Sequence, residues 1–150
     1  MLLFTQMLIR FVLALALGAL VGLEREYAGK EAGVRTNMLV SGGAALFTII
    51  GLALPYLVAN SAENLPEVIA RNSGFLSVIA NIVIGIGFLG GGIIVKTEGR
   101  VLGLTTAATV WITAAIGILA GLGLVYFSLA AAALTAGLLY LSRLVRLPSD

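Results

Sequence analysis

The sequence predicts an all-α integral membrane protein, built as a bundle of five transmembrane helices. Hydrophobic residues make up 60% of the 150-residue chain, and 19 glycines add to this apolar share. Charged residues make up only 11%, whereas a soluble domain carries about 25%. So few charges could not cover the surface of a soluble domain of this length. The composition therefore excludes an ordinary soluble domain and a disordered chain.

The residue types that are missing exclude several classes of catalytic and metal site. The chain contains no histidine and no cysteine, which excludes disulfides, Cys/His zinc sites and catalytic pairs of His with Ser or Cys. The net charge is only +2 and the basic residues are scattered, which argues against nucleic-acid binding. We expect a protein that is not an enzyme, with no metal site, no cofactor and no nucleic-acid partner.

Five apolar stretches have the length of a membrane-crossing helix, which needs about 20 residues. The expected spans are Leu3–Leu23, Thr36–Val58, Phe75–Val95, Thr105–Ala120 and Leu124–Ser142. The loops between them are too short for a separate domain. We therefore expect residues 1–150 to form a single transmembrane domain, with no soluble C-terminal domain.

Each expected span has a reason to begin or end where it does. The first carries Arg10 but lacks a basic start and a clear cleavage site, so we expect it to be retained. The second begins at Thr36 and Asn37, either of which could cap a helix. The third ends in a glycine-rich run. The fourth begins at Thr105 and Thr106, which could also act as caps, and a short glycine turn joins it to the fifth.

Basic residues in the loops orient these spans. Seven fall on one side of the membrane when the spans alternate, and only Arg71 falls in a loop on the other side. The seven are Arg25, Lys30, Arg35, Lys96, Arg100, Arg143 and Arg146. Because basic loops stay in the cytoplasm, we expect the N-terminus outside and the C-terminus in the cytoplasm.

Three polar segments gather at the expected cytoplasmic boundary, at residues 22–26, 33–37 and 96–106. Their candidate contact residues are Glu24, Arg25, Arg35, Thr36, Asn37, Thr105 and Thr106. One interpretation is a solvated loop with helix caps and an ordinary Glu24–Arg35 ion pair. The other is a site for a partner or ligand, where the guanidinium groups of Arg25 and Arg35 clamp an anionic group. The sequence leaves both interpretations open.

Small residues recur at Gly-x3-Gly spacing in three of the expected helices, which in lipid allows helix backbones to approach closely. The glycines are Gly18 and Gly22, Gly87 and Gly91 with Gly90 beside them, and Gly117 and Gly121. The first interpretation is packing within the molecule. The alternatives are a homodimer face, or a break in the third helix at Gly90-Gly91-Gly92 whose carbonyls line a cavity.

Arg10 and Asn81 stand out among the polar residues inside the apolar stretches. Arg10 could reach outward to the membrane surface, or pair inside the bundle with a carbonyl or with Asn81. We expect Asn81 to hydrogen-bond another helix rather than to bind a ligand. No acidic residue lies inside an apolar stretch, which argues against the usual mechanism of a cation carrier.

Four motifs, taken together, indicate a known family. They are Gly-Leu-Glu-Arg-Glu at 22–26, Gly-Val-Arg-Thr-Asn at 33–37, Gly-Ile-Gly-Phe-Leu-Gly-Gly-Gly at 85–92, and Gly-Leu-Thr-Thr-Ala-Ala-Thr-Val-Trp at 103–111. In order and spacing they resemble the MgtC/SapB family of bacterial membrane proteins, over about residues 8–142. Thr105 stands where members often have Asn, and Ile112 where some have Cys, so activities that depend on those side chains do not carry over.

The resemblance implies a five-helix domain of the bacterial inner (plasma) membrane that self-associates. It also implies links to magnesium homeostasis and to virulence, and action on other membrane proteins. We expect a regulator whose partners are the lipid bilayer, another membrane protein and a second copy of the chain in a homodimer. The alternative is a small Mg²⁺ channel or transporter, with a pathway near Asn81 and the glycine-rich part of the third helix.

Overall fold

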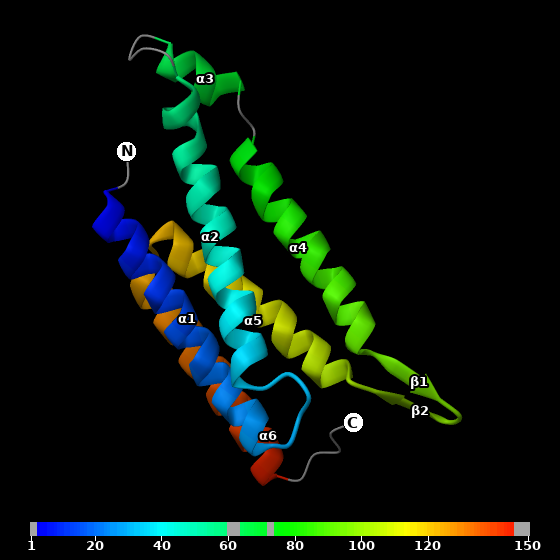
Figure 1. Ribbon diagram of the computed structural model, residues 1–150. Coiled ribbons are helices and arrows are strands. Elements are labelled where there is room, and N and C mark those ends of the chain that lie inside the picture. The colour runs from blue at the N-terminus through cyan, green and yellow to red at the C-terminus, as the bar shows by residue number, and fades with distance from the viewer. Residues whose placement is uncertain (1–2, 60–63, 72–73, 146–150) are drawn as a thin grey trace.

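The computed structural model describes residues 3–59, 64–71 and 74–145, and these residues are mostly helical (Figure 1). The helices are α1 Phe4–Tyr27, α2 Val34–Val58, α3 Leu65–Arg71, α4 Gly74–Ile93, α5 Leu104–Leu122 and α6 Val125–Leu144. A short antiparallel hairpin, β1 Val95–Thr97 with β2 Arg100–Leu102, joins α4 to α5. In these residues α1, α2, α5 and α6 are long and apolar enough to cross a membrane, and α4 holds a shorter apolar segment, Ser77–Ile93.

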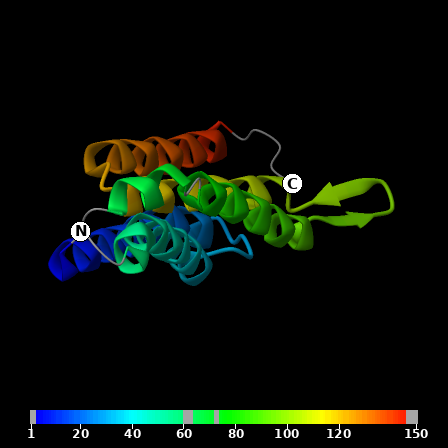
Figure 2. The ribbon, with the colours of Figure 1, turned by 90° about the horizontal axis from the view of Figure 1, so that it is seen from above.

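Helix α5 lies in the middle of the bundle and contacts α1, α2, α4 and α6. Figure 2 shows α6 and α2 on opposite sides of α5, and α1 contacts all three of these helices. Among the described residues, α4 packs mainly along α5 and α2, and Figure 1 shows it at the edge of the bundle. The core side chains that hold the helices together include Val21, Val40, Val110 and Ile116. Many large apolar side chains face outward, which suits helices surrounded by lipid.

The polar segments come together at one end of the bundle. The end of α1, the start of α2, the β hairpin and the end of α6 all lie there (Figure 1). The opposite end holds the α5–α6 turn and the short helix α3. Arg146, one of the seven basic residues used to orient the spans, lies outside the described residues.

The helix boundaries at the polar end differ from those expected. Helix α1 runs four residues past Leu23, so the polar 22–26 segment is helical. The expected threonine and asparagine caps are wrong, because Gly33 is the N-cap of α2 and Gly103 is the N-cap of α5. Gly103 has φ +83°, a left-handed conformation that costs glycine little. Neither cap has a side chain, so no side-chain oxygen of the cap residue bonds the first turn.

The break that was one alternative for the glycine-rich helix does not occur. Helix α4 continues without interruption through Gly90-Gly91-Gly92 to Ile93. The chain turns only afterwards, in the hairpin, where Gly99 adopts φ +84° between the two strands. No backbone carbonyls are therefore released along α4 to line a cavity.

Candidate functional site

The helix α2 lies between two glycine-bearing faces. On α1, a Cβ added to Gly22 would lie 2.6 Å from Cα of Val34, and one added to Gly18 would overlap the carbonyl oxygen of Asn37. On α5, a Cβ on Gly121 would lie 2.9 Å from the carbonyl oxygen of Ala45, and one on Gly117 would overlap the backbone of Ser41. Only residues without a side chain allow these backbones to approach so closely.

The third pair of glycines is placed differently. A Cβ added to Gly87 or Gly91 would have no atom within 4 Å among the described residues of other elements. Gly90 does face a neighbour, because its added Cβ would lie 3.6 Å from the Ala107 side chain on α5. Packing inside the molecule therefore accounts for Gly90 but not for Gly87 and Gly91.

Asn37 joins three elements at the polar end. Its Nδ2 donates to the carbonyl oxygens of Ala32 at 2.8 Å and Gly33 at 2.9 Å, in the loop before α2. Its Oδ1 accepts a hydrogen bond from Thr113 Oγ1 of α5 at 2.9 Å. Asn37 is 0% exposed, so this side chain fixes the loop and the two helices and is not available to a ligand. Thr106 is also buried, at 2% exposed.

Glu24 and Arg25 form the ion pair of this region. Oε2 of Glu24 accepts from Nε of Arg25 at 2.6 Å and lies 2.5 Å from its Nη2. Arg25 is only 4% exposed and Glu24 9%, so both side chains are buried together. The Glu24–Arg35 pair that one interpretation of the sequence proposed does not form, because Glu24 pairs with Arg25 and Arg35 is exposed. Oε1 of Glu24 has no hydrogen-bond partner within the described part of the chain.

Two pockets open at this end, and they separate the two arginines. A shallow polar pocket of about 320 Å³ is lined by Glu26, Lys30, Glu31, Gly33, Val34, Arg35 and Thr36. A smaller pocket of about 120 Å³ is lined by Arg25, Ala28, Lys30, Thr105, Leu139, Ser142 and Arg143. Arg25 and Arg35 line different pockets, which share Lys30, so the structure does not bring the two guanidinium groups together as one interpretation of the sequence proposed.

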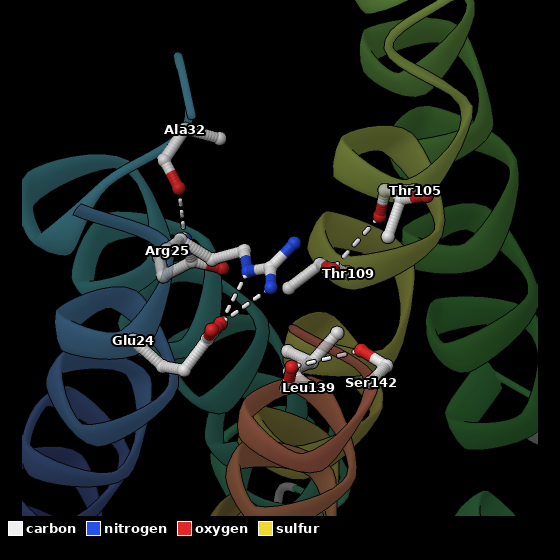
Figure 3. Close-up of polar contacts among 8 residues, drawn as sticks. Glu24, Arg25, Ala32, Thr105, Thr109, Leu139 and Ser142 are labelled. Carbon is white, nitrogen blue, oxygen red and sulfur yellow. Dashed lines mark hydrogen bonds and ion pairs between the residues drawn. The ribbon is translucent and has the colours of Figure 1, made fainter. Parts of the chain in front are cut away.

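The smaller pocket brings together residues that the sequence analysis did not connect. Figure 3 shows Arg25 of α1 near Thr105 at the start of α5 and Ser142 near the end of α6. The sequence analysis used Arg143 only as an orienting charge, because a basic residue at the end of a last helix ordinarily has that role. Ser142 was treated only as the end of the last span. Only the packing of α6 against α1 and α5 brings them to Arg25.

Arg10 and Asn81, the polar residues that stood out inside the apolar stretches, have separate environments. Nη1 of Arg10 donates to the carbonyl oxygen of Gly121 at 3.0 Å, so Arg10 pairs inside the bundle, with a carbonyl. That oxygen belongs to the last turn of α5, where the helix leaves carbonyls without partners and the dipole favours a cation. Asn81 is exposed and lines a cavity of about 430 Å³ with apolar neighbours such as Phe47 and Ile86. Its expected hydrogen bond to another helix does not form among the described residues.

No group of three acidic side chains gathers within residues 3–59, 64–71 and 74–145 in the way that a cation site requires. The two pockets of the polar end present guanidinium, ammonium and hydroxyl donors, and the larger one also holds the carboxylates of Glu26 and Glu31. These donors suit the binding of anionic or polar groups, most directly in the smaller pocket, whose described lining residues include no acid.

Comparison with known proteins gives the family. The MgtC family model matches residues 11–147. Protein MgtC of Brucella abortus is 43% identical over 112 residues, which cover 75% of this chain and 41% of the relative. Protein MgtC of Salmonella typhimurium is 41% identical over 116 residues, which cover 77% of this chain and 43% of the relative. The chain thus spans less than half the length of these relatives.

An uncharacterized protein of Synechocystis is similar to the same degree, at 43% identity over 117 residues, covering 78% of this chain and 44% of the relative. No solved structure matches the chain. The family model extends from α1 to the end of α6 and therefore includes every pocket described above. With its apolar helices and this match over most of its length, the chain is a multi-pass membrane protein and belongs to the MgtC family.

Proposed function

We propose that the chain is a non-enzymatic protein of the bacterial inner membrane that binds and regulates another membrane protein in magnesium homeostasis. The observation that carries the proposal is the polar pocket at Arg35, which is exposed beside a rigid bundle end. Glu26 strengthens this rigidity, because its Oε2 accepts the backbone N–H of Val34 at 2.9 Å. A charged and polar surface on a fixed frame is suited to recognising a protein partner.

The interior of the bundle supports the same proposal. Several of its buried polar side chains bond within the protein: Asn37 to Thr113, Thr48 to the carbonyl of Ala44, and Thr109 to the carbonyl of Thr105. The hydroxyl of buried Ser41 has no hydrogen-bond partner among the described residues. The glycine contacts of α1 and α5 with α2 leave these backbones in direct contact. Function is then carried by the surface of the bundle rather than by a pathway between α1, α2 and α5.

The proposed orientation has five spans, with the N-terminus outside. Helix α4 has 20 residues, which at 1.5 Å per residue gives about 30 Å, the thickness of a bilayer core. The chain has no cysteine, so single cysteines can be labelled without background. In intact cells a membrane-impermeant maleimide should label Ala70→Cys on α3 but not Glu98→Cys in the hairpin. The reverse labelling would refute this orientation.

The test of the functional proposal is complementation of growth at low magnesium. Arg35→Ala should leave the amount of protein in the membrane unchanged, because Arg35 is exposed, but should abolish growth. Arg100→Ala removes the same charge from the hairpin at the same end and should complement normally. Full complementation by stably inserted Arg35→Ala would refute the proposed binding surface.

The second candidate function is a magnesium channel or transporter, favoured by the cavity that Asn81 lines between α2 and α4. Its test is magnesium flux into vesicles containing the purified protein, compared with empty vesicles. Saturable flux that falls in Asn81→Leu would establish this candidate. Absence of flux from folded, correctly inserted protein would exclude it and leave the regulator.

A further inference from the structure

We propose that the cleft between α1, α5 and α6 binds one anionic phospholipid. The phosphate would occupy the small pocket at Arg25 and Arg143, and an acyl chain would lie in the groove between α5 and α6. This site shares Lys30 with the Arg35 pocket but is built around Arg25 and Arg143, which do not line that pocket. It can therefore be tested separately from the proposed regulatory surface, with variants that change neither Lys30 nor Arg35.

The first observation is that buried Arg25 has donors left over. A guanidinium carries five N–H donors, and the pair with Glu24 engages only Nε and Nη2. Figure 3 shows the remaining terminal nitrogen pointing away from Glu24 and toward α5. The ion pair thus holds the guanidinium in one orientation and leaves its other edge facing the pocket. A phosphate oxygen is the acceptor that such an edge binds best.

The second observation is the charge around that edge. Lys30 and Arg143 also line the pocket, whereas Glu24 does not. Thr105 lies in the first turn of α5, and the N-cap of that helix supplies no side-chain hydrogen bond. The N–H groups of this turn and the positive end of the helix dipole therefore add to the attraction for an anion.

The third observation is an apolar groove that continues from the pocket. It has a volume of about 560 Å³ and shares Thr105 and Leu139 with the pocket. Its lining residues are Thr105, Ala108, Thr109, Trp111, Ile112, Leu134, Thr135, Leu138 and Leu139. The hydroxyls of Thr109 and Thr135 donate to carbonyls of their own helices, so an apolar chain in the groove would leave neither donor without a partner.

Together these observations select the occupant. A free anion would satisfy the basic pocket but not the groove, and an apolar partner helix would satisfy the groove but not the pocket. A phospholipid has an anionic head joined to apolar chains and matches both. Basic pockets between membrane helices on the cytoplasmic side are known sites for anionic lipid headgroups.

The chain carries its own probe, because its single tryptophan, Trp111, lines the groove and is 50% exposed. The full-length protein is reconstituted in phosphatidylcholine vesicles that contain a small fraction of lipid brominated on its acyl chains. Bromine quenches tryptophan fluorescence on contact. Brominated phosphatidylglycerol should quench Trp111 more strongly than brominated phosphatidylcholine at the same mole fraction.

Three exposed-residue variants make the test specific. Arg143→Gln should reduce the preference for phosphatidylglycerol about fivefold, the effect of one basic residue near a membrane surface. Arg143→Lys should retain most of it. Arg100→Gln, which removes a charge at the same end but outside the pocket, should leave it unchanged.

The outcomes decide between the proposal and its alternatives. Equal quenching by the two brominated lipids would overturn it. Equal losses in Arg143→Gln and Arg100→Gln would also overturn it, since they would indicate general attraction to a charged membrane surface. Helical circular dichroism of each variant verifies that the compared proteins are folded.

Discussion

The same glycine spacing occurs in two regions of this molecule with opposite surroundings. On α1 and α5, the glycines of the Gly-x3-Gly pairs touch the backbone of α2. On α4, Gly87 and Gly91 have nothing beside them in the described structure. The difference lies in the facing helix: α2 presents small or compact residues at Asn37, Ser41 and Ala45, one turn apart. A small-residue pair therefore indicates close packing only where a complementary row faces it.

The largest expected effect is a matched pair of alanine substitutions. Gly117→Ala should lower the free energy of unfolding by about 3 kcal/mol, because the new Cβ overlaps the backbone of Ser41. Gly91→Ala should raise it by about 0.5–1 kcal/mol, because alanine favours the helix and the added methyl meets open space. Unfolding in mixed micelles, followed by helical circular dichroism, measures both. Equal responses would remove the distinction between the two regions.

A second comparison uses the two asparagines. Asn37→Ala should lower the free energy of unfolding by about 2 kcal/mol, because it leaves the Thr113 hydroxyl and the buried Ala32 carbonyl without partners. Asn81→Ala on α4 should change it by less than about 0.5 kcal/mol, since Asn81 is exposed. The same unfolding measurement applies. A large loss in Asn81→Ala would show that this side chain has a partner in the membrane.

The bond between Arg10 and α5 should have an intermediate effect. Arg10→Met removes a charged hydrogen bond to the Gly121 carbonyl and should lower the free energy of unfolding by about 1.5 kcal/mol. Arg35→Met, at an exposed position, is the control and should leave it nearly unchanged. If both variants unfold alike, the Arg10 bond does not contribute to stability.

The smallest loss of stability is expected where a second copy of the chain would bind. We propose that Gly87 and Gly91 form the face of a homodimer, because they are exposed small residues on α4. The double substitution Gly87→Leu, Gly91→Leu should not lower monomer stability, because leucine favours a helix over glycine and both positions face open space, but it should abolish cross-linked dimer. Dimer that survives this substitution would place the contact elsewhere.

The sequence predicted the helical membrane architecture well, because long apolar stretches have few other structures available to them. It missed the hairpin and the short helix α3, although both have local signals. Pro66 and Glu67 favour a helix start, and Gly99 favours a tight turn between two short strands. These signals cover only a few residues each, whereas the long apolar stretches beside them determined which segments were predicted as structured.

The polar end was predicted as a region but not in detail. Spacing suggested that Glu24 would reach across the loop to Arg35, whereas it pairs with its neighbour Arg25. Which of two arginines turns inward depends on the angle at which α1 meets α5 and α6, and local sequence does not encode that angle. For the same reason the sequence did not predict that Arg143 lines a pocket with Arg25.

The link between Arg10 and Gly121 also bears on how the chain is assembled as it is synthesised. The two residues are separated by 111 positions, so the acceptor of Arg10 is made long after Arg10 itself. At about 5–20 residues per second, the interval is on the order of ten seconds. During that time the first helix carries a cation whose hydrogen-bond acceptor on α5 has not yet been made. The first helix can therefore form all its contacts only when the chain is nearly complete. Although α1 is the first helix to be synthesised, it is among the last to complete its packing.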